Sequence, residues 1–268
     1  MTTRAGRFLN GATIMSTPTP GQLQVARDAG FDGIEARAER LLASDDEVDE
    51  TARVAAEGEV WSLNGIRIGL TPSGGLMRDT LESDLESRLD VCRAVGAAYL
   101  LVVPPRIEAL DEAAALPGIR DGLEVVRDRA AAVGVGVAFE FLGFFDCPIA
   151  TPSAAAAAVR GIDGVDLVID SCHWHASGSL PLDAVPVERL AMVHLNDAPA
   201  KPPPEVEDAD RVMPGEGVIK LSVLLTDLRG RGYNGPWSLE TFNPAYWRAD
   251  PQAIARRGAA ALDRILGT

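Results

Sequence analysis

A regular alternation of two hydrophobic patterns constrains the fold of this chain more than any other feature. Short runs rich in β-branched and aromatic residues recur at intervals of roughly 30 residues, and each is followed by a segment with helical periodicity. We count eight runs: RFLNGA (7–12), GIEAR (33–37), WSLNGIRIG (61–69), YLLVVP (99–104), VGVAFEF (135–141), VDLVIDS (165–171), LAMVHLND (190–197) and PWSLETF (236–242). Eight βα units in series predict an α/β fold, a single (β/α)₈ TIM barrel over residues 1–268.

The segments between these runs carry helix and loop signals. Thr19-Pro20 begins a helical stretch that ends at Gly30, and Asp250-Pro251 begins the last helix. The alanine run 154–158 is expected to be a helix of small residues packed on the barrel. The Pro-rich, acidic segment 198–211 is expected to be a long loop after the seventh strand, where long loops often form part of an active site.

Composition narrows the class of partner and the compartment. The formal net charge of −14 opposes binding to nucleic acid and to anionic membranes, so the expected partner is a small molecule. No apolar run is long enough to cross a bilayer, and MTTRAGRFLN at the start lacks the apolar core of a signal peptide. Three cysteines without paired spacing indicate a reducing compartment, and we expect a cytoplasmic protein. The sequence marks no interface, although barrels of this size are often homo-oligomers.

Potential metal ligands lie at the ends of four consecutive predicted strands. They are Glu140 in AFEF, Asp170 in VIDS, His194 in MVHLND and Glu240 in SLETF, each within an apolar context. In a barrel the carboxyl ends of all strands meet at one mouth, so these side chains should converge. Buried carboxylates that converge repel one another and lose their hydration, and a divalent cation compensates both effects. The open alternative is pairing with arginine, which is abundant in this chain.

At this point the sequence resembles a known family. The stretches LNGAT, GIEAR, SLNGI, AFEFLG, VIDSCHWHASGS, DADRVMPGEGVI and SLETFNPAYW are similar to those of the xylose-isomerase-like barrels of sugar isomerases and epimerases, in particular the inosose (2-keto-myo-inositol) isomerases. They cover nearly the whole chain in order.

The resemblance implies a set of functional residues. One divalent metal ion would be held by Glu140, Asp170, His194 and Glu240, with Mn²⁺ preferred and Mg²⁺, Co²⁺ or Zn²⁺ compatible with the same donors. His173, in the loop after the sixth strand, and Arg211, just before MPGEG, would contact the substrate.

Other polar residues near the mouth match the pattern more weakly. Asn64, taken as the end of the third strand, and Glu35, near the end of the second, are candidate substrate contacts, and Asn10 has the same status; ordinary hydrogen bonding at the mouth would explain all three equally well. His175 is expected to be structural rather than a ligand. Trp174 could line the pocket or pack in the core.

The expected chemistry is proton abstraction next to a carbonyl. A metal with open positions can take the carbonyl oxygen and the adjacent hydroxyl of a keto-polyol together and acidify the C–H bond between them, which makes an ene-diolate accessible. Glu140 and Glu240 are the expected base and acid, in either order, and His173 would assist with the hydroxyl proton. Of the possible reactions, the resemblance favours isomerisation of an inosose most. The next most favoured reaction is 3-epimerisation of a ketose.

Several alternatives use a similar barrel. A lyase or dehydratase acting on a keto-inositol or a 3-keto-glycoside could use the same metal site. An apurinic endonuclease with three zinc ions is disfavoured, because the chain has only three histidines and is acidic. A Schiff-base aldolase is disfavoured because Lys201 and Lys220, the only lysines, lie outside the predicted strands. A barrel that binds a sugar without catalysis stays open.

A phosphorylated substrate is not expected. Barrels commonly bind phosphate through backbone amides after the last two strands. Here the seventh loop contains PGEG with the acidic Glu216, and the eighth, NPAYWRADP, contains no glycine. We therefore expect a non-phosphorylated, neutral keto-polyol.

Overall fold

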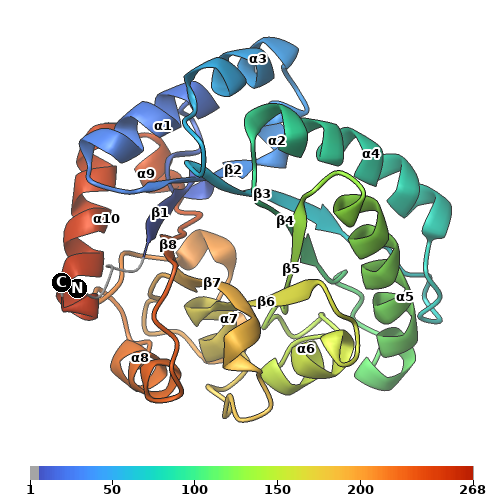
Figure 1. Cartoon of the computed structure of the whole chain (residues 1–268). Helices are drawn as coiled ribbons and strands as arrows, with labels where there is room; N and C mark the ends of the chain where they lie inside the picture. The colour runs from blue at the N-terminus through green and yellow to red at the C-terminus, as the bar shows by residue number, and fades with distance from the viewer. Residues whose placement is uncertain (1–5, 268) are drawn as a thin grey trace.

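The computed structural model describes residues 6–267. Eight parallel strands close into a barrel in chain order, with β8 paired to β1 (Figure 1). The strands are β1 (Arg7–Asn10), β2 (Gly33–Arg37), β3 (Val60–Arg67), β4 (Tyr99–Val103), β5 (Gly136–Glu140), β6 (Val165–Asp170), β7 (Leu190–Leu195) and β8 (Trp237–Leu239). All eight predicted strands are confirmed, and the predicted (β/α)₈ barrel is the observed fold. Residues 1–5 and 268 of the predicted domain lie outside the described range.

Helices surround the barrel or lie at its ends. They are α1 (Thr19–Asp28), α2 (Ala38–Leu41), α3 (Asp45–Val54), α4 (Arg78–Val95), α5 (Glu112–Ala131), α6 (Pro152–Val159), α7 (Ser171–Ala176), α8 (Leu221–Gly230), α9 (Pro244–Trp247) and α10 (Pro251–Leu266). Short 3₁₀ turns occur at Gly11–Ile14, Val187–Arg189, Pro203–Glu205 and Asp208–Asp210. Among the described residues, no helix is both long and apolar enough to cross a membrane.

Helix boundaries follow the local signals in the sequence. Helix α1 begins at Thr19, and Gly30 follows its end with a φ of 82°, which a residue with a side chain adopts only with strain. The Asp250 side chain accepts hydrogen bonds from two amides of the first turn of α10. The alanine run lies within α6, as predicted. Four of its five residues are buried, with exposed fractions of 5% or less.

The barrel interior has two layers because side chains alternate along each strand. The lower layer is an apolar cluster, whose buried members are Phe8, Leu101, Ala138, Val168, Ala191 and Met192. Two residues farther along the strands, Asn10, Glu140, Asp170 and His194 follow Phe8, Ala138, Val168 and Met192 in turn. An apolar layer of side chains therefore lies directly beneath a ring of buried polar side chains.

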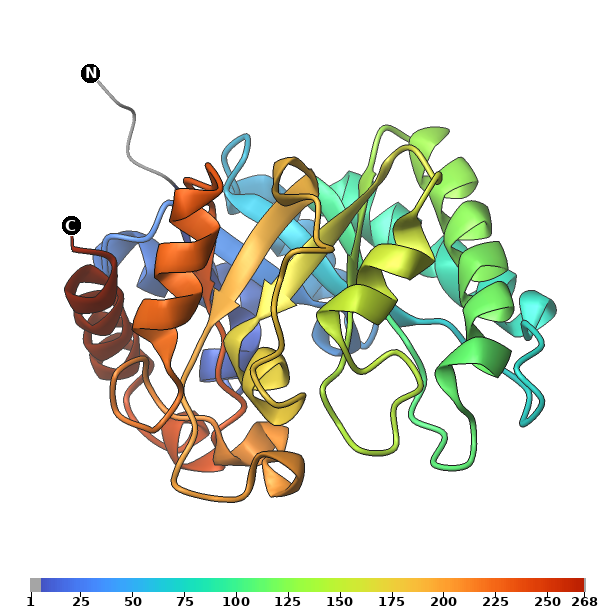
Figure 2. The ribbon, with the colours of Figure 1, turned by 90° about the horizontal axis from the view of Figure 1, so that it is seen from below.

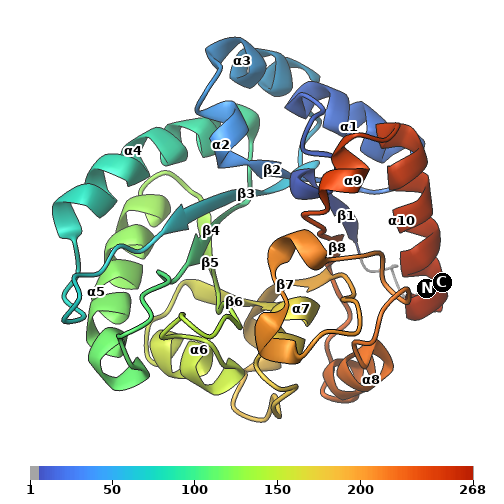
Figure 3. The same cartoon turned by 180° about the vertical axis from the view of Figure 1, so that it is seen from behind.

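The loop after β7 is long but anchored. Figure 2 shows this segment, in orange, extending from one end of the barrel, and Figure 3 shows α7 and α9 on the same side. Asp197 and Val212 form an antiparallel bridge across its base, with N···O distances of 3.0 and 2.8 Å. The Asp197 carboxylate also accepts hydrogen bonds from the amides of Gly215 and Ile219. Arg211, next to this bridge, is thereby held over the mouth of the barrel.

Candidate metal centre and substrate pocket

Four buried side chains meet at the carboxyl ends of β5 to β8. Glu140 and Asp170 are the last residues of β5 and β6, His194 is the next-to-last residue of β7, and Glu240 follows β8 directly. One potential ligand atom from each lies within 4.8 Å of the others. The structure thus brings together the four residues named from the sequence, although Glu140 and Glu240 are 100 residues apart along the chain.

His194 lies at the centre of this group and has carboxylates on both sides of its ring. Its Nδ1 is 3.1 Å from Glu140 and 3.2 Å from Glu240, and its Nε2 is 3.2 Å from Glu35. Burial lowers the pKa of His194, but the three carboxylates outweigh burial and raise the pKa well above its usual value. The cluster therefore demands positive charge, which a proton on the imidazole or a divalent cation can supply.

Arginine compensates only part of the acidic cluster. One guanidinium nitrogen of the buried Arg211 lies 3.0 Å from Asp170 and 2.8 Å from Glu240. Glu140 has no arginine partner among the described residues, and its burial raises its pKa despite the attraction of His194. Burial also raises the pKa of Glu240, but His194 and the arginines outweigh it and hold this pKa far below its usual value. Arginine pairing, the alternative considered from the sequence, leaves Glu140 unexplained.

The donor set fits a hard or borderline divalent cation. Three carboxylates and one imidazole are typical ligands of Mn²⁺, Mg²⁺, Co²⁺ or Zn²⁺. The Nε2 of His194 faces Glu35, so the Nδ1 lone pair is the one directed toward the other ligands. A carboxylate behind a ligating imidazole is the usual way in which proteins select its tautomer.

His173 is held beside the cluster by Asp170 and Arg211. Asp170 accepts a hydrogen bond from the His173 amide at 2.8 Å, and Arg211 lies 3.0 Å from the His173 Nε2. A guanidinium can only donate, so Nε2 accepts and the neutral ring carries its hydrogen on Nδ1. That Nδ1 is buried without a partner in the described part of the protein. The His173 side chain also lines the pocket.

Glu35 lies in the polar ring and is not part of the pocket lining. Its carboxylate accepts hydrogen bonds from Asn10, Ser62 and Asn64 at 3.2, 2.7 and 3.2 Å and also from Ser238. Burial alone would raise the pKa of Glu35, but the attraction of His194 outweighs burial. The pKa therefore lies below its usual value, and the carboxylate stays ionised. This geometry agrees with hydrogen bonding at the mouth, which the sequence left open beside a substrate contact, and it places Glu35 behind His194.

Asn64 lies within β3, which continues to Arg67, rather than at the end of the strand as expected. It lines the pocket and accepts hydrogen bonds from Asn10 at 3.1 Å and Arg37 at 3.5 Å. Asn10 also donates to Glu240 at 2.9 Å and is fully buried, so it links β1 to the acidic cluster. Asn64 stays a predicted substrate contact.

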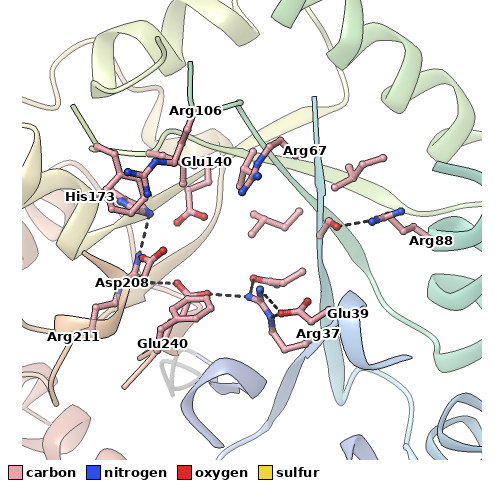
Figure 4. A pocket seen from close by; sticks show the side chains of 18 residues that line it. Arg37, Glu39, Arg67, Arg88, Arg106, Glu140, His173, Asp208, Arg211 and Glu240 are labelled. Atoms are coloured by element: carbon pink, nitrogen blue, oxygen red, sulfur yellow. Dashed lines mark hydrogen bonds and ion pairs between the residues drawn. The ribbon is translucent and has the colours of Figure 1, made fainter. Parts of the chain in front are cut away.

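An open pocket of about 420 Å³ lies above the cluster, a volume suited to a small ligand. Glu140, Glu240, His173 and Arg211 all contribute to its wall, and Figure 4 shows them around the cavity. His175 and Trp174 do not line it. Trp174 is a core residue whose Nε1 donates to the Leu180 carbonyl oxygen at 2.8 Å.

Sequence reasoning missed two contributors to the site. Asn196 is fully buried and donates to Asp170 at 2.7 Å and to the Glu240 carbonyl oxygen at 3.0 Å. The motif HLND, which contains His194, was its only signal. Arg37 lines the pocket with its guanidinium 3.6 Å from Glu240, and its signal was its place at the end of the second strand.

Comparisons with known proteins agree with this architecture. Residues 23–265 match the sequence model of a family described as xylose isomerase-like TIM barrel. An inosose isomerase of Bacillus velezensis is 32% identical over 189 residues, which cover 69% of this chain and 68% of the relative. A 3-dehydroshikimate dehydratase of Pseudomonas aeruginosa is 29% identical over 260 residues, which cover 92% of this chain but only 40% of the relative.

The fold also matches solved structures. The crystal structure of the IOLI protein with a binding zinc atom superposes with a TM-score of 0.88 over 98% of both chains, at 24% sequence identity. The sequence match and the shared architecture lead to one assignment: this chain belongs to the xylose isomerase-like TIM barrel family.

Proposed function

We propose that this protein is a divalent-metal-dependent isomerase or epimerase that acts on a non-phosphorylated keto-polyol through an ene-diolate intermediate. The observation that carries the proposal is the buried group of Glu140, Asp170, His194 and Glu240 at the base of an open pocket. The inosose isomerases among its relatives support an inosose as substrate and a place in inositol catabolism.

The four residues would hold one metal ion, and we propose Mn²⁺ because three of the four donors are carboxylates. A bound divalent ion would polarise the carbonyl and the adjacent hydroxyl of the substrate. The C–H bond of the carbon that bears the hydroxyl would thereby become more acidic. Glu140 and Glu240 both line the pocket, so one can take the proton and the other can return it. His173, which also lines the pocket, would help to hold or move the hydroxyl proton of the substrate.

Arg211 would set the orientation of this machinery. It contacts Asp170, Glu240 and His173 at the same time and is 1% exposed, so little space is left for it to adopt other positions. A fixed guanidinium also offers charge to a substrate oxygen without reorganisation.

Elimination is the second candidate reaction. The P. aeruginosa 3-dehydroshikimate dehydratase aligns with 92% of this chain, a wider match than that of the B. velezensis inosose isomerase. Removal of the same proton with loss of a β-hydroxyl group would give a dehydratase from the same residues.

Incubation in D₂O distinguishes these reactions. The Mn²⁺-loaded protein is mixed separately with inososes, ketoses and 3-dehydroshikimate, and the products are analysed by NMR and mass spectrometry. Isomerisation or epimerisation predicts deuterium on carbon and products that retain all oxygen atoms. A dehydratase predicts a product lighter by one water. Absence of exchange and of product with every substrate would contradict the proposed function.

We propose that the chain acts as one barrel domain on a small molecule, without nucleic acid or membrane, because its net charge is −14. We propose a cytoplasmic location, supported by three free cysteines. A homo-oligomeric assembly is a further expectation, and light scattering would test it.

A further inference from the structure

The mouth of the pocket is rich in arginine although the chain as a whole is acidic. Five arginines line it: Arg37, Arg67, Arg88, Arg106 and Arg211. Three of these have carboxylate partners among the described residues. Arg37 pairs with Glu39 and Arg106 with Asp146, at 3.0 and 2.7 Å. Arg211 bonds the acidic cluster as described above.

Arg67 and Arg88 are different because neither pairs with a carboxylate of the described residues. Arg67, the last residue of β3, is exposed, and its side chain makes no hydrogen bond or ion pair within the described part of the chain. Within residues 6–267, the side chain of Arg88, on α4, donates only to the carbonyl oxygens of Gly65 and Asp84, at 3.0 and 2.8 Å. Figure 4 shows Arg67 pointing into the pocket between Glu140 and Arg88, on the wall across from Arg211.

Two uncompensated guanidinium groups on one wall create a positive potential in a partly enclosed cavity. Of the carboxylates that line the pocket, Glu39 and Asp208 already pair with Arg37 and Arg211, and Glu140 and Glu240 would bind the metal ion, so none is left to pair with this wall. A neutral polyol, which we expected from the sequence, would likewise leave it unpaired. The wall therefore favours a substrate that brings its own negative charge.

We infer that the substrate is a keto-polyol carrying a carboxylate, that Arg67 binds this carboxylate directly, and that Arg88 reinforces the positive potential beside it. The inference rests on the proposed reaction, because it takes the vicinal keto-alcohol of the substrate to lie at the acidic cluster, but it replaces the neutral inosose by an anionic keto-polyol. It adds a binding residue for the charged substituent at the opposite wall.

The backbone of the other loops favours a carboxylate over a phosphate. Beyond β7, the amides of Gly215 and Ile219 donate to Asp197, and beyond β8 the amide of Ala245 donates to Asn243. These amides, at the position where barrels commonly bind phosphate, are thus already used. A planar guanidinium matches the two oxygens of a carboxylate.

A matched pair of probes isolates the charge. Shikimate and its methyl ester share ring and hydroxyl groups but differ in the carboxylate charge, and isothermal titration of each into the Mn²⁺-loaded protein gives two dissociation constants. We expect the wild type to bind shikimate about tenfold more tightly than the ester, as charge-assisted hydrogen bonding allows. Arg67→Gln should bring the two affinities close together, and Arg88→Gln should narrow the difference less.

Arg256→Gln is the matched control. Arg256 is exposed on α10, outside the pocket lining, so this variant changes the net charge equally without touching the mouth. It should keep the wild-type preference. The inference is overturned if the wild type binds both probes equally or binds neither at millimolar concentration, if Arg67→Gln keeps the full preference, or if Arg256→Gln loses it as well.

The proposed function is tested by two other measurements on the wild-type protein, its metal content and its deuterium exchange. A protein that binds metal and exchanges deuterium into an inosose but shows no preference for the anionic probe would keep the proposed function and lose this inference.

Discussion

Glu35 lies 3.2 Å from the Nε2 of His194, while Glu140 and Glu240 contact the Nδ1 of the same ring. The imidazole is thus oriented from behind, and the nitrogen that faces the acidic cluster is left to bind a cation. Such an arrangement places the hydrogen on Nε2 and the lone pair on Nδ1. Glu35 is therefore a positioning residue in this account, rather than a contact for the substrate.

Replacing Glu35 should weaken metal binding. Glu35→Gln keeps the shape of the side chain, but its amide can donate to Nε2 and select the opposite tautomer. We expect the affinity for Mn²⁺ or Zn²⁺ to fall about tenfold or more, measured by competition with a chelator. Ser238→Ala is the control, since Ser238 bonds Glu35 without contacting the cluster. Equal metal affinity in Glu35→Gln and the wild type would refute the positioning role.

Removal of the metal should destabilise the fold. A ligand that binds only the folded protein stabilises it by about 2.7 kcal/mol at 100 times its dissociation constant. We expect EDTA to lower the Tm of the wild type and added Mn²⁺ to restore it, as followed by scanning calorimetry. In Asp170→Asn the side-chain oxygen that accepts from the His173 amide is retained, but the charge is lost. A metal-dependent shift as large in this variant as in the wild type would exclude Asp170 as a ligand.

Arg211 should not tolerate replacement by lysine. Its guanidinium reaches Asp170, Glu240 and His173 together, and a single ammonium group cannot reproduce this fork. We expect Arg211→Lys to lower kcat/KM about tenfold or more on whichever substrate is turned over, with metal content retained. The control is Arg257→Lys, since Arg257 forms an exposed two-point pair with Glu216 far from the cluster. Unchanged kcat/KM in Arg211→Lys would contradict the assignment.

The cysteines should resist alkylation in the folded protein. Burial raises the pKa of Cys92, Cys147 and Cys172 to about 12, so the reactive thiolate is scarce at about pH 8. We expect iodoacetamide to modify none of them at this pH within the time that labels a small free thiol, and all three once guanidinium chloride unfolds the chain. Mass spectrometry provides the readout. Rapid labelling of the native protein would show that at least one thiol is accessible.

Much of this architecture could be predicted from local patterns. The alternation of strands and helices was enough to predict the barrel, because eight βα units in series have few other ways to bury their apolar faces. Glu140, Asp170, His194 and Glu240 could be named because strand ends converge in any parallel barrel. The distances between these four side chains could not be predicted, because they depend on the stagger between neighbouring strands.

Other parts of the site have no local signal. Glu35 appeared to be a mouth residue, but the register that pairs it with Asn10 and Ser62 places it in the buried ring. The arginine-rich mouth was also missed. Long side chains reach it from separate elements, and Arg67 and Arg88 look like ordinary surface residues in the sequence. A neutral substrate was expected because the loops after the last two predicted strands lack a phosphate-binding pattern, and nothing in the sequence indicated these two arginines at the pocket.

The central claim is that four side chains hold one divalent cation, and elemental analysis tests it most directly. The purified protein is equilibrated with Mn²⁺, freed of loose ions and measured by inductively coupled plasma mass spectrometry beside Glu240→Gln. We predict about one equivalent of metal per chain in the wild type, and a markedly lower content with loss of activity in the variant. A wild-type protein that retains no metal, or a Glu240→Gln variant with full metal content and activity, would contradict the claim.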